Sequence, residues 1–100
     1  MKAYQIDEQG RVVAVAHPWE EQDEDKDWQK IVSDHGYMHI TGGEFFGFDL
    51  YKHEDGERYY LCVDVVFENH DFFIKDFSEL IRVAQIVRPL MELLLAGEES

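Results

Sequence analysis

The segment EFFGFDLYKHEDGERYYLCVDVVFE, residues 44–68, constrains the fold most because it reads as two β-strands joined at Asp55-Gly56. Asp-Gly is favoured in the type I′ turn of a two-residue β-hairpin. A turn there pairs Leu50 with Leu61, Phe48 with Val63 and Phe46 with Val65 on one face, and Tyr51 with Tyr60, Asp49 with Cys62, Gly47 with Asp64 and Phe45 with Val66 on the other. The first face is wholly apolar, and a slip of one residue would expose it, so the pattern predicts this register.

A second, shorter hairpin is predicted at the N-terminus. Residues 2–7 and 12–17 read as strands that flank the turn sequence DEQGR, in which Gly10 can adopt a positive φ. Pro18 ends the second strand because proline has no N–H to donate to a neighbouring strand.

Two helices are predicted, one between the two hairpins and one after the central hairpin. The first begins at Glu21 or Asp23 and ends near Gly36, a residue type that commonly terminates helices. Its buried stripe would consist of Trp28, Ile31 and Val32. The second helix covers residues 76–96, and Pro89 within it predicts a kink or a break near Arg88.

The second helix carries more apolar surface than one core contact requires. Its core stripe is predicted to contain Phe77, Leu80, Ala84, Val87, Met91 and Leu94. A second apolar stripe, made of Val83, Ile86, Leu90 and Leu93, widens the apolar arc to about 200°. The second stripe therefore predicts the interface of a homodimer, unless the kink or the first hairpin brings it into the same core.

The predicted fold is α+β in the order ββ-α-ββ-α. It is a four-stranded, mostly antiparallel sheet with the short helix and the long C-terminal helix packed on one face. The length of 100 residues suits one domain with a single core.

The net charge limits the partners that this chain can bind. Twenty-two Asp and Glu against nine Lys and Arg give a formal charge of −13. Such a surface repels DNA, RNA and anionic membranes, so it favours a basic protein partner, or it serves only solubility. The single cysteine, Cys62, excludes an internal disulfide, and we find neither an apolar leader nor a membrane-length apolar segment. We therefore expect a cytoplasmic protein.

The acidic run EEQDEDKD, residues 20–27, does not fit a calcium loop. Asp23, Asp25 and Asp27 occupy positions 1, 3 and 5 of an EF-hand-like loop. The glycine required at position 6 is Trp28, and the glutamate required at position 12 is Asp34. Calcium binding is therefore rejected.

The run carries more negative charge than a helix start needs. Two or three carboxylates would suffice to interact with the positive end of the helix dipole. The excess favours contact with a basic partner through Glu20, Glu21, Asp23, Glu24, Asp25 and Asp27, with Trp19 and Trp28 as aromatic anchors. The alternative is a solvated helix start with Trp28 in the core.

The polar face of the central hairpin is the second candidate site. Asp49 and Asp64 would be diagonal neighbours on this face, beside Tyr51 and Tyr60. Two carboxylates beside tyrosines could bind a cation, a polar ligand or the arginines of a partner. Alternatively, the long C-terminal helix or the first hairpin covers this face and buries the tyrosines.

No metal, cofactor or catalytic residue is predicted. His35 and His39 are four residues apart, but Gly36 separates them and the glutamate of the HExxH zinc motif is missing. Cys62 lies in mid-strand, which suits a packed thiol better than an activated one. His70-Asp71 is interpreted as part of a turn after the central hairpin.

Three hypotheses of function follow. The first is a non-enzymatic acidic protein that occludes a basic nucleic-acid-handling protein, as a nucleic-acid mimic does. Phage anti-restriction and anti-CRISPR proteins and toxin-immunity proteins are functional classes with such electrostatics. The second is a homodimeric structural or adaptor module, and the third is a small enzyme or ligand-binding protein that uses the face of Asp49 and Asp64.

Overall fold

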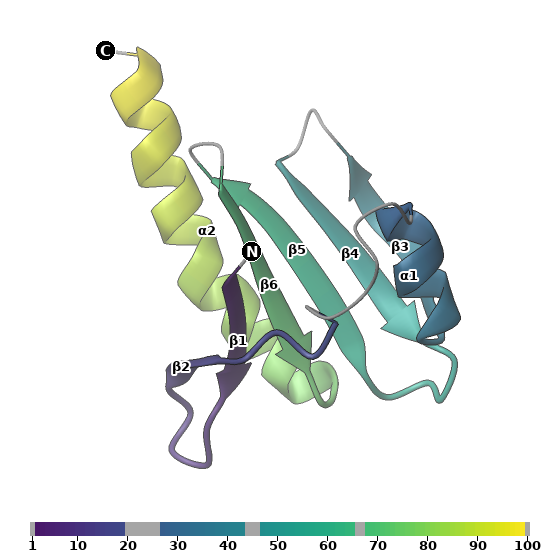
Figure 1. Cartoon of the computed structure of the whole chain (residues 1–100). Helices are drawn as coiled ribbons and strands as arrows, with labels where there is room; N and C mark the ends of the chain where they lie inside the picture. The colour runs from purple at the N-terminus through teal and green to yellow at the C-terminus, as the bar shows by residue number, and fades with distance from the viewer. Residues whose placement is uncertain (1, 20–26, 44–46, 66–67, 100) are drawn as a thin grey trace.

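The computed structural model describes residues 2–19, 27–43, 47–65 and 68–99. Its elements are β1 (Lys2–Ile6), β2 (Val12–Val15), α1 (Trp28–Asp34), β3 (Tyr37–Gly43), β4 (Phe48–His53), β5 (Tyr59–Val65), β6 (Glu68–Ile74) and α2 (Phe77–Glu99). The strands form one sheet in the order β2-β1-β6-β5-β4-β3 (Figure 1). β1 and β6 are parallel, and the other neighbouring strands are antiparallel.

The central hairpin β4–β5 has the predicted register. Leu50 pairs with Leu61, Phe48 with Val63, Tyr51 with Tyr60 and Asp49 with Cys62. The connection is longer than the predicted two residues, because the last hydrogen bond runs from His53 N–H to Arg58 C=O at 2.8 Å. The remaining predicted partners, Phe45, Phe46 and Val66, lie outside the described residues.

The predicted four-stranded sheet is wrong, because the described part of the chain forms six strands. β3 begins directly after the predicted helix stop at Gly36, where no strand was predicted, and β6 contains His70-Asp71, which was interpreted as part of a turn. In β6 the burial of Asp71 is offset by a hydrogen bond from His17, a residue that is distant in sequence.

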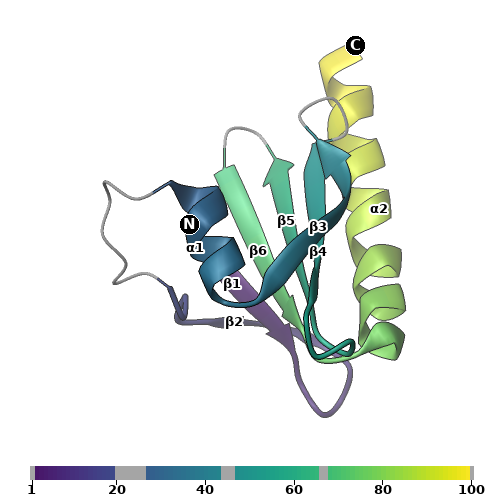
Figure 2. The same cartoon turned by 90° about the vertical axis from the view of Figure 1, so that its right-hand side faces the viewer.

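The helices lie on opposite faces of the sheet, so their predicted placement on one face is also wrong (Figure 2). α2 packs on β5 and β6, where Val83 and Val87 meet Leu61 and Phe72. α1 packs on the other face through Ile31 and Val32. The apolar period of a helix identifies its buried side but not the face of the sheet that it covers.

Each end of α1 has an identifiable cause. The Asp27 carboxylate accepts a hydrogen bond from the Gln29 N–H at 3.1 Å and so caps the N-terminus. Gly36 follows the C-terminus with φ of +87°, as predicted. The predicted starts at Glu21 or Asp23 lie outside the described residues.

The core stripe of α2 differs from the predicted one. Val83 is fully buried in the core of its own chain, whereas Phe77 and Ala84 are exposed. Val83 is therefore unavailable for the predicted dimer interface, while Ile86 is exposed. The side chains of Leu90 and Leu93 lie outside those described.

α2 is a single helix from Phe77 to Glu99, so the predicted break near Arg88 does not occur. Proline removes one N–H donor from a helix, and here the turns on both sides of Pro89 continue it. Among the described residues, no helix is both long and apolar enough to cross a membrane.

Candidate functional site

The side of the sheet that α1 covers, here called the α1 face, carries the four predicted site residues of the central hairpin. Alternation in β4 and β5 directs Asp49, Tyr51, Tyr60 and Asp64 to this face, as predicted. A row of paired positions crosses it from Asp49 through Cys62 to Asp71. The neighbouring row contains Tyr51, Tyr60 and Phe73. Polar and aromatic side chains therefore lie in adjacent rows on one surface.

A cleft between α1 and the strands β3 and β4 contains two of these residues, Asp49 and Tyr51. It measures about 490 Å³ and is also lined by Gln29, Ser33, Met38 and His39. His39 Nε2 lies 2.9 Å from Asp49 Oδ1, and both side chains remain nearly half exposed. The cleft therefore presents a carboxylate that solvent or a partner can reach.

The other two predicted residues lie outside this cleft. Tyr60 is fully buried, so it cannot contact a partner. The alternative predicted a covered tyrosine, but Trp19 and Trp28 cover it rather than the long helix or the first hairpin. Burial raises the pKa of its hydroxyl well above the ordinary value, and the nearby Asp71 and Cys62 raise it further. Asp64 is exposed at the far end of β5.

Trp19 and Trp28 are not available as the predicted anchors for a partner. Trp19 is only 5% exposed and packs against Trp28, Tyr60 and Phe73 with ring centroids 5.0–5.8 Å apart. Trp28 is half-buried, and its indole N–H donates to the Tyr60 hydroxyl at 3.3 Å. Both tryptophans therefore belong to the core on the α1 face.

These same contacts fix the two ends of the acidic run. Because the rings of Trp19 and Trp28 are in contact, the two residues that flank the run lie side by side. Asp27, the last residue of the run, caps α1. Glu20, Glu21, Asp23, Glu24 and Asp25 lie outside the described residues.

A buried His17–Asp71 pair was missed by the sequence analysis. Asp71 is fully buried, and its Oδ2 lies 2.7 Å from Nε2 of the buried His17. The Trp19 backbone N–H donates to His17 Nδ1 at 3.1 Å, so Nδ1 carries no proton and Nε2–H donates to Asp71. Asp71 Oδ1 has no hydrogen bond among the described residues. A neutral imidazole therefore stabilises a buried carboxylate.

Cys62 has no geometry for nucleophilic chemistry. Burial raises the pKa of its thiol to about 12, and the carboxylates of Asp71 and Asp49 contribute to the increase. The thiol therefore stays protonated at neutral pH and cannot act as a thiolate.

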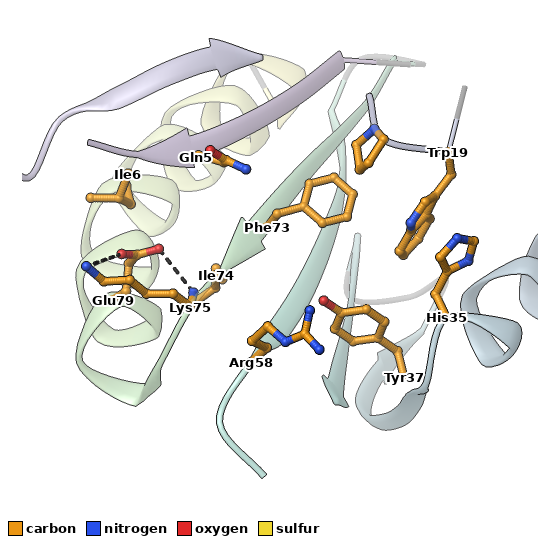
Figure 3. A pocket seen from close by; sticks show the side chains of 11 residues that line it. Gln5, Ile6, Trp19, His35, Tyr37, Arg58, Phe73, Ile74, Lys75 and Glu79 are labelled. Atoms are coloured by element: carbon orange, nitrogen blue, oxygen red, sulfur yellow. Dashed lines mark hydrogen bonds and ion pairs between the residues drawn. The ribbon is translucent and has the colours of Figure 1, made fainter. Parts of the chain in front are cut away.

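A separate pocket of about 380 Å³ opens between the aromatic cluster and the start of α2 (Figure 3). Its floor contains Trp19, Tyr37, Phe73 and Ile74, of which only Phe73 is more than 8% exposed. Its rim carries Gln5, Arg58, Lys75 and Glu79. Sequence reasoning missed this pocket, because its lining comes from six separate segments of the chain.

No group of three metal-ligating side chains occurs among the described residues. Comparison with known proteins found no match to any family model, any curated protein or any solved structure. The assignment of function therefore rests on the geometry and charge of this chain.

Proposed function

We propose that this protein is a non-enzymatic module that binds a basic, nucleic-acid-handling protein and occludes its nucleic-acid surface. One observation carries the proposal: the Asp49 cleft adjoins the attachment point of the acidic run. Asp27 ends the run and accepts a hydrogen bond from Gln29 N–H, and Gln29 lines the cleft that contains Asp49. Asp27, the last residue of the run, and Asp49 of β4 are thus linked through Gln29 on the α1 face.

Internal pairing of the basic residues supports the proposal. Arg11 pairs with Asp7, Arg58 with Asp55 and Lys75 with Glu79, at distances of 2.7–3.7 Å. Exposed carboxylates such as Glu8, Asp34 and Asp64 have no such partner within the part of the chain that the structure describes. The surplus negative charge is therefore directed to the solvent, where it accelerates encounters with a basic protein.

The environments of the candidate reactive groups favour a binding role over catalysis. His17 and Asp71 are buried beneath the aromatic cluster, and Cys62 is protonated at neutral pH. The accessible polar groups of the α1 face are carboxylate, imidazole, amide and hydroxyl groups that suit hydrogen bonds to arginine and lysine. We place this interaction in the cytoplasm, where a single cysteine remains reduced.

Affinity capture with matched charge variants tests the proposal. One variant neutralises the run (Glu20→Gln, Glu21→Gln, Glu24→Gln, Asp25→Asn), and a second is Asp49→Asn. The control neutralises four carboxylates elsewhere (Glu8→Gln, Glu57→Gln, Glu98→Gln, Glu99→Gln), so its net charge equals that of the first variant. We expect a basic protein that elutes from the wild type with salt and binds either site variant about tenfold more weakly, but not the control.

The captured protein is then purified and mixed with its nucleic acid in the presence of each variant. The wild type and the control should displace the nucleic acid, and the two site variants should fail to do so. Equal binding by all four proteins, or a complex that leaves nucleic-acid binding intact, would contradict the proposal.

A further inference from the structure

The pocket in Figure 3 has the composition of a small-molecule site, although the proposed function does not use it. Its volume of about 380 Å³ lies within the range of about 300–1,000 Å³ that is typical of ligand pockets. Aromatic and aliphatic side chains form its floor, and a few polar groups stand around the rim. An apolar floor with few polar groups is the usual arrangement for binding an organic ligand in a fixed orientation.

The floor of the pocket is held in place by its own packing. Trp19 meets Phe73 edge-on at 5.1 Å and stacks with His35 at 4.5 Å. Phe73 in turn stacks on the buried Tyr60 at 5.2 Å. A preformed surface of this kind binds a planar ring without the entropic cost of ordering the receptor.

The polar groups of the pocket select for a negative charge. Arg58 and Lys75 line it together with one carboxylate, Glu79, so the lining is net positive in a chain of formal charge −13. The Arg58 guanidinium and the Tyr37 hydroxyl point toward each other over the floor (Figure 3). The pKa values of both groups respond to this proximity: Arg58 opposes the rise that burial causes for Tyr37, and Tyr37 contributes to the rise for Arg58.

Arg58 is also pre-oriented. Its Nε donates to Asp55 Oδ2 at 2.7 Å, and its Nη2 lies 3.1 Å from His53 Nε2. These two nitrogens account for part of the five N–H donors of a guanidinium, so donors remain for a ligand. Across the pocket, the Gln5 amide points toward the Phe73 ring (Figure 3).

We infer that this pocket binds a planar aromatic carboxylate, with its ring on Phe73 and Trp19 and its carboxylate at Arg58 and Tyr37. The ring takes the apolar floor, and the carboxylate takes charge-assisted hydrogen bonds from the rim. A neutral ring would leave the remaining N–H donors of Arg58 unused, and an aliphatic acid would not use the aromatic floor.

Titration with indole-3-carboxylate, monitored by ¹H–¹⁵N correlation spectra, tests this inference, with indole-3-carboxamide as the neutral comparison. We expect saturable shifts of the backbone amides of Gln5, Tyr37 and Phe73, and at least about tenfold weaker binding of the carboxamide. Arg58→Gln should weaken the carboxylate about three- to tenfold, whereas Lys75→Gln should weaken it much less, because the Lys75 ammonium pairs with Glu79 on the far side of the pocket. The control, Lys30→Gln, removes the same charge from the exposed surface of α1 and should bind as the wild type does.

Three results would overturn the inference: no saturable shift up to the solubility limit of the probe, equal binding of carboxylate and carboxamide, or shifts confined to other residues. If Arg58→Gln fails to fold because the β4–β5 connection loses its Asp55 pair, Arg58→Lys decides, since lysine keeps the charge beside Asp55 but lacks the planar set of N–H donors and should still weaken the carboxylate. The inference is independent of the proposed partner, because Asp49→Asn should leave the titration unchanged.

Discussion

The buried His17–Asp71 pair allows a quantitative test of the structure, because its two members should respond very differently to substitution. In His17→Ala the Asp71 carboxylate keeps its charge and its burial but loses its hydrogen-bond donor. Leaving a buried charged group without its hydrogen-bond partner costs at least about 1–3 kcal/mol. The lost ring contacts with Trp19, Trp28 and Phe73 add to this cost.

Asp71→Asn should be nearly neutral. The amide oxygen of asparagine can still accept the hydrogen bond from His17 Nε2–H, and the buried charge is removed. The Tyr60 hydroxyl and the Cys62 sulfur lie near the position that the new NH₂ group would occupy. We therefore expect the free energy of unfolding to change by no more than about 1 kcal/mol.

The double variant His17→Ala/Asp71→Asn should be more stable than His17→Ala alone. No charge is then left buried without a donor, so the double variant should lose about 2 kcal/mol less stability than the sum of the two single variants. A domain of this length has a total stability of about 5–15 kcal/mol, so differences of this size are readily measured.

Urea unfolding at pH 7, monitored by tryptophan fluorescence and circular dichroism, measures these differences. Glu8→Gln, a change at an exposed turn residue, serves as the control and should stay within about 0.5 kcal/mol. The reasoning is refuted if Asp71→Asn costs as much as His17→Ala, or if the two single effects simply add in the double variant.

Three further predictions concern single positions. Because its pKa is about 12, the Cys62 thiol should not react with a disulfide reagent at pH 8 until urea unfolds the chain, and a reaction in the folded state would contradict its burial. Hydrogen bonds from the Arg58 side chain and from the Glu57 and Arg58 N–H groups lower the pKa of Asp55. The wild type should therefore be more stable than Asp55→Asn above about pH 4, the pKa of Asp in the unfolded chain, and should lose this advantage as the pH falls toward 2. A stability difference that does not depend on pH would contradict the assignment. Gly42→Ala should lower the free energy of unfolding in urea by more than about 2 kcal/mol, because the backbone φ is +107° and the new Cβ would collide with the Phe48 carbonyl oxygen. Gly56→Ala, at a φ of +80° but with open space around the new Cβ, should lower it by only about 1–2 kcal/mol.

The central hairpin was predictable from the sequence because two independent signals agreed. The turn residues Asp55-Gly56 and the alternation of apolar residues require the same pairing, and the structure contains it. The stop of α1 at Gly36 was predictable for a similar local reason. Local chemistry therefore identified these elements without knowledge of what packs against them.

The strands β3 and β6 were not predictable by the same means. Residues 68–74 begin with ENHD, which reads as a turn, yet Asp71 is the most buried residue of the strand. The run of Phe72, Phe73 and Ile74 was the available signal for a strand. It was outweighed by polar neighbours, because the donor that stabilises Asp71 lies 54 residues away at His17.

The site residues were predicted in part, for a reason that follows from strand geometry. Pairing placed Asp49, Tyr51, Tyr60 and Asp64 on one face, but alternation does not tell what covers that face. Trp19 covers Tyr60 and leaves Asp49 and Tyr51 at the open cleft, so equivalent positions in the pattern differ in accessibility. The covering segment comes from the turn after β2, where Pro18 had indicated only the end of a strand.

The same covering segment links the two sites of this protein. Trp19 closes the aromatic core that carries the Asp49 cleft, and it also forms the floor of the pocket between Arg58 and Lys75. The acidic run begins directly after Trp19, whose backbone N–H also fixes the His17 ring that stabilises Asp71. A change in the packing of Trp19 would therefore act on the pocket, the buried pair and the origin of the acidic run together.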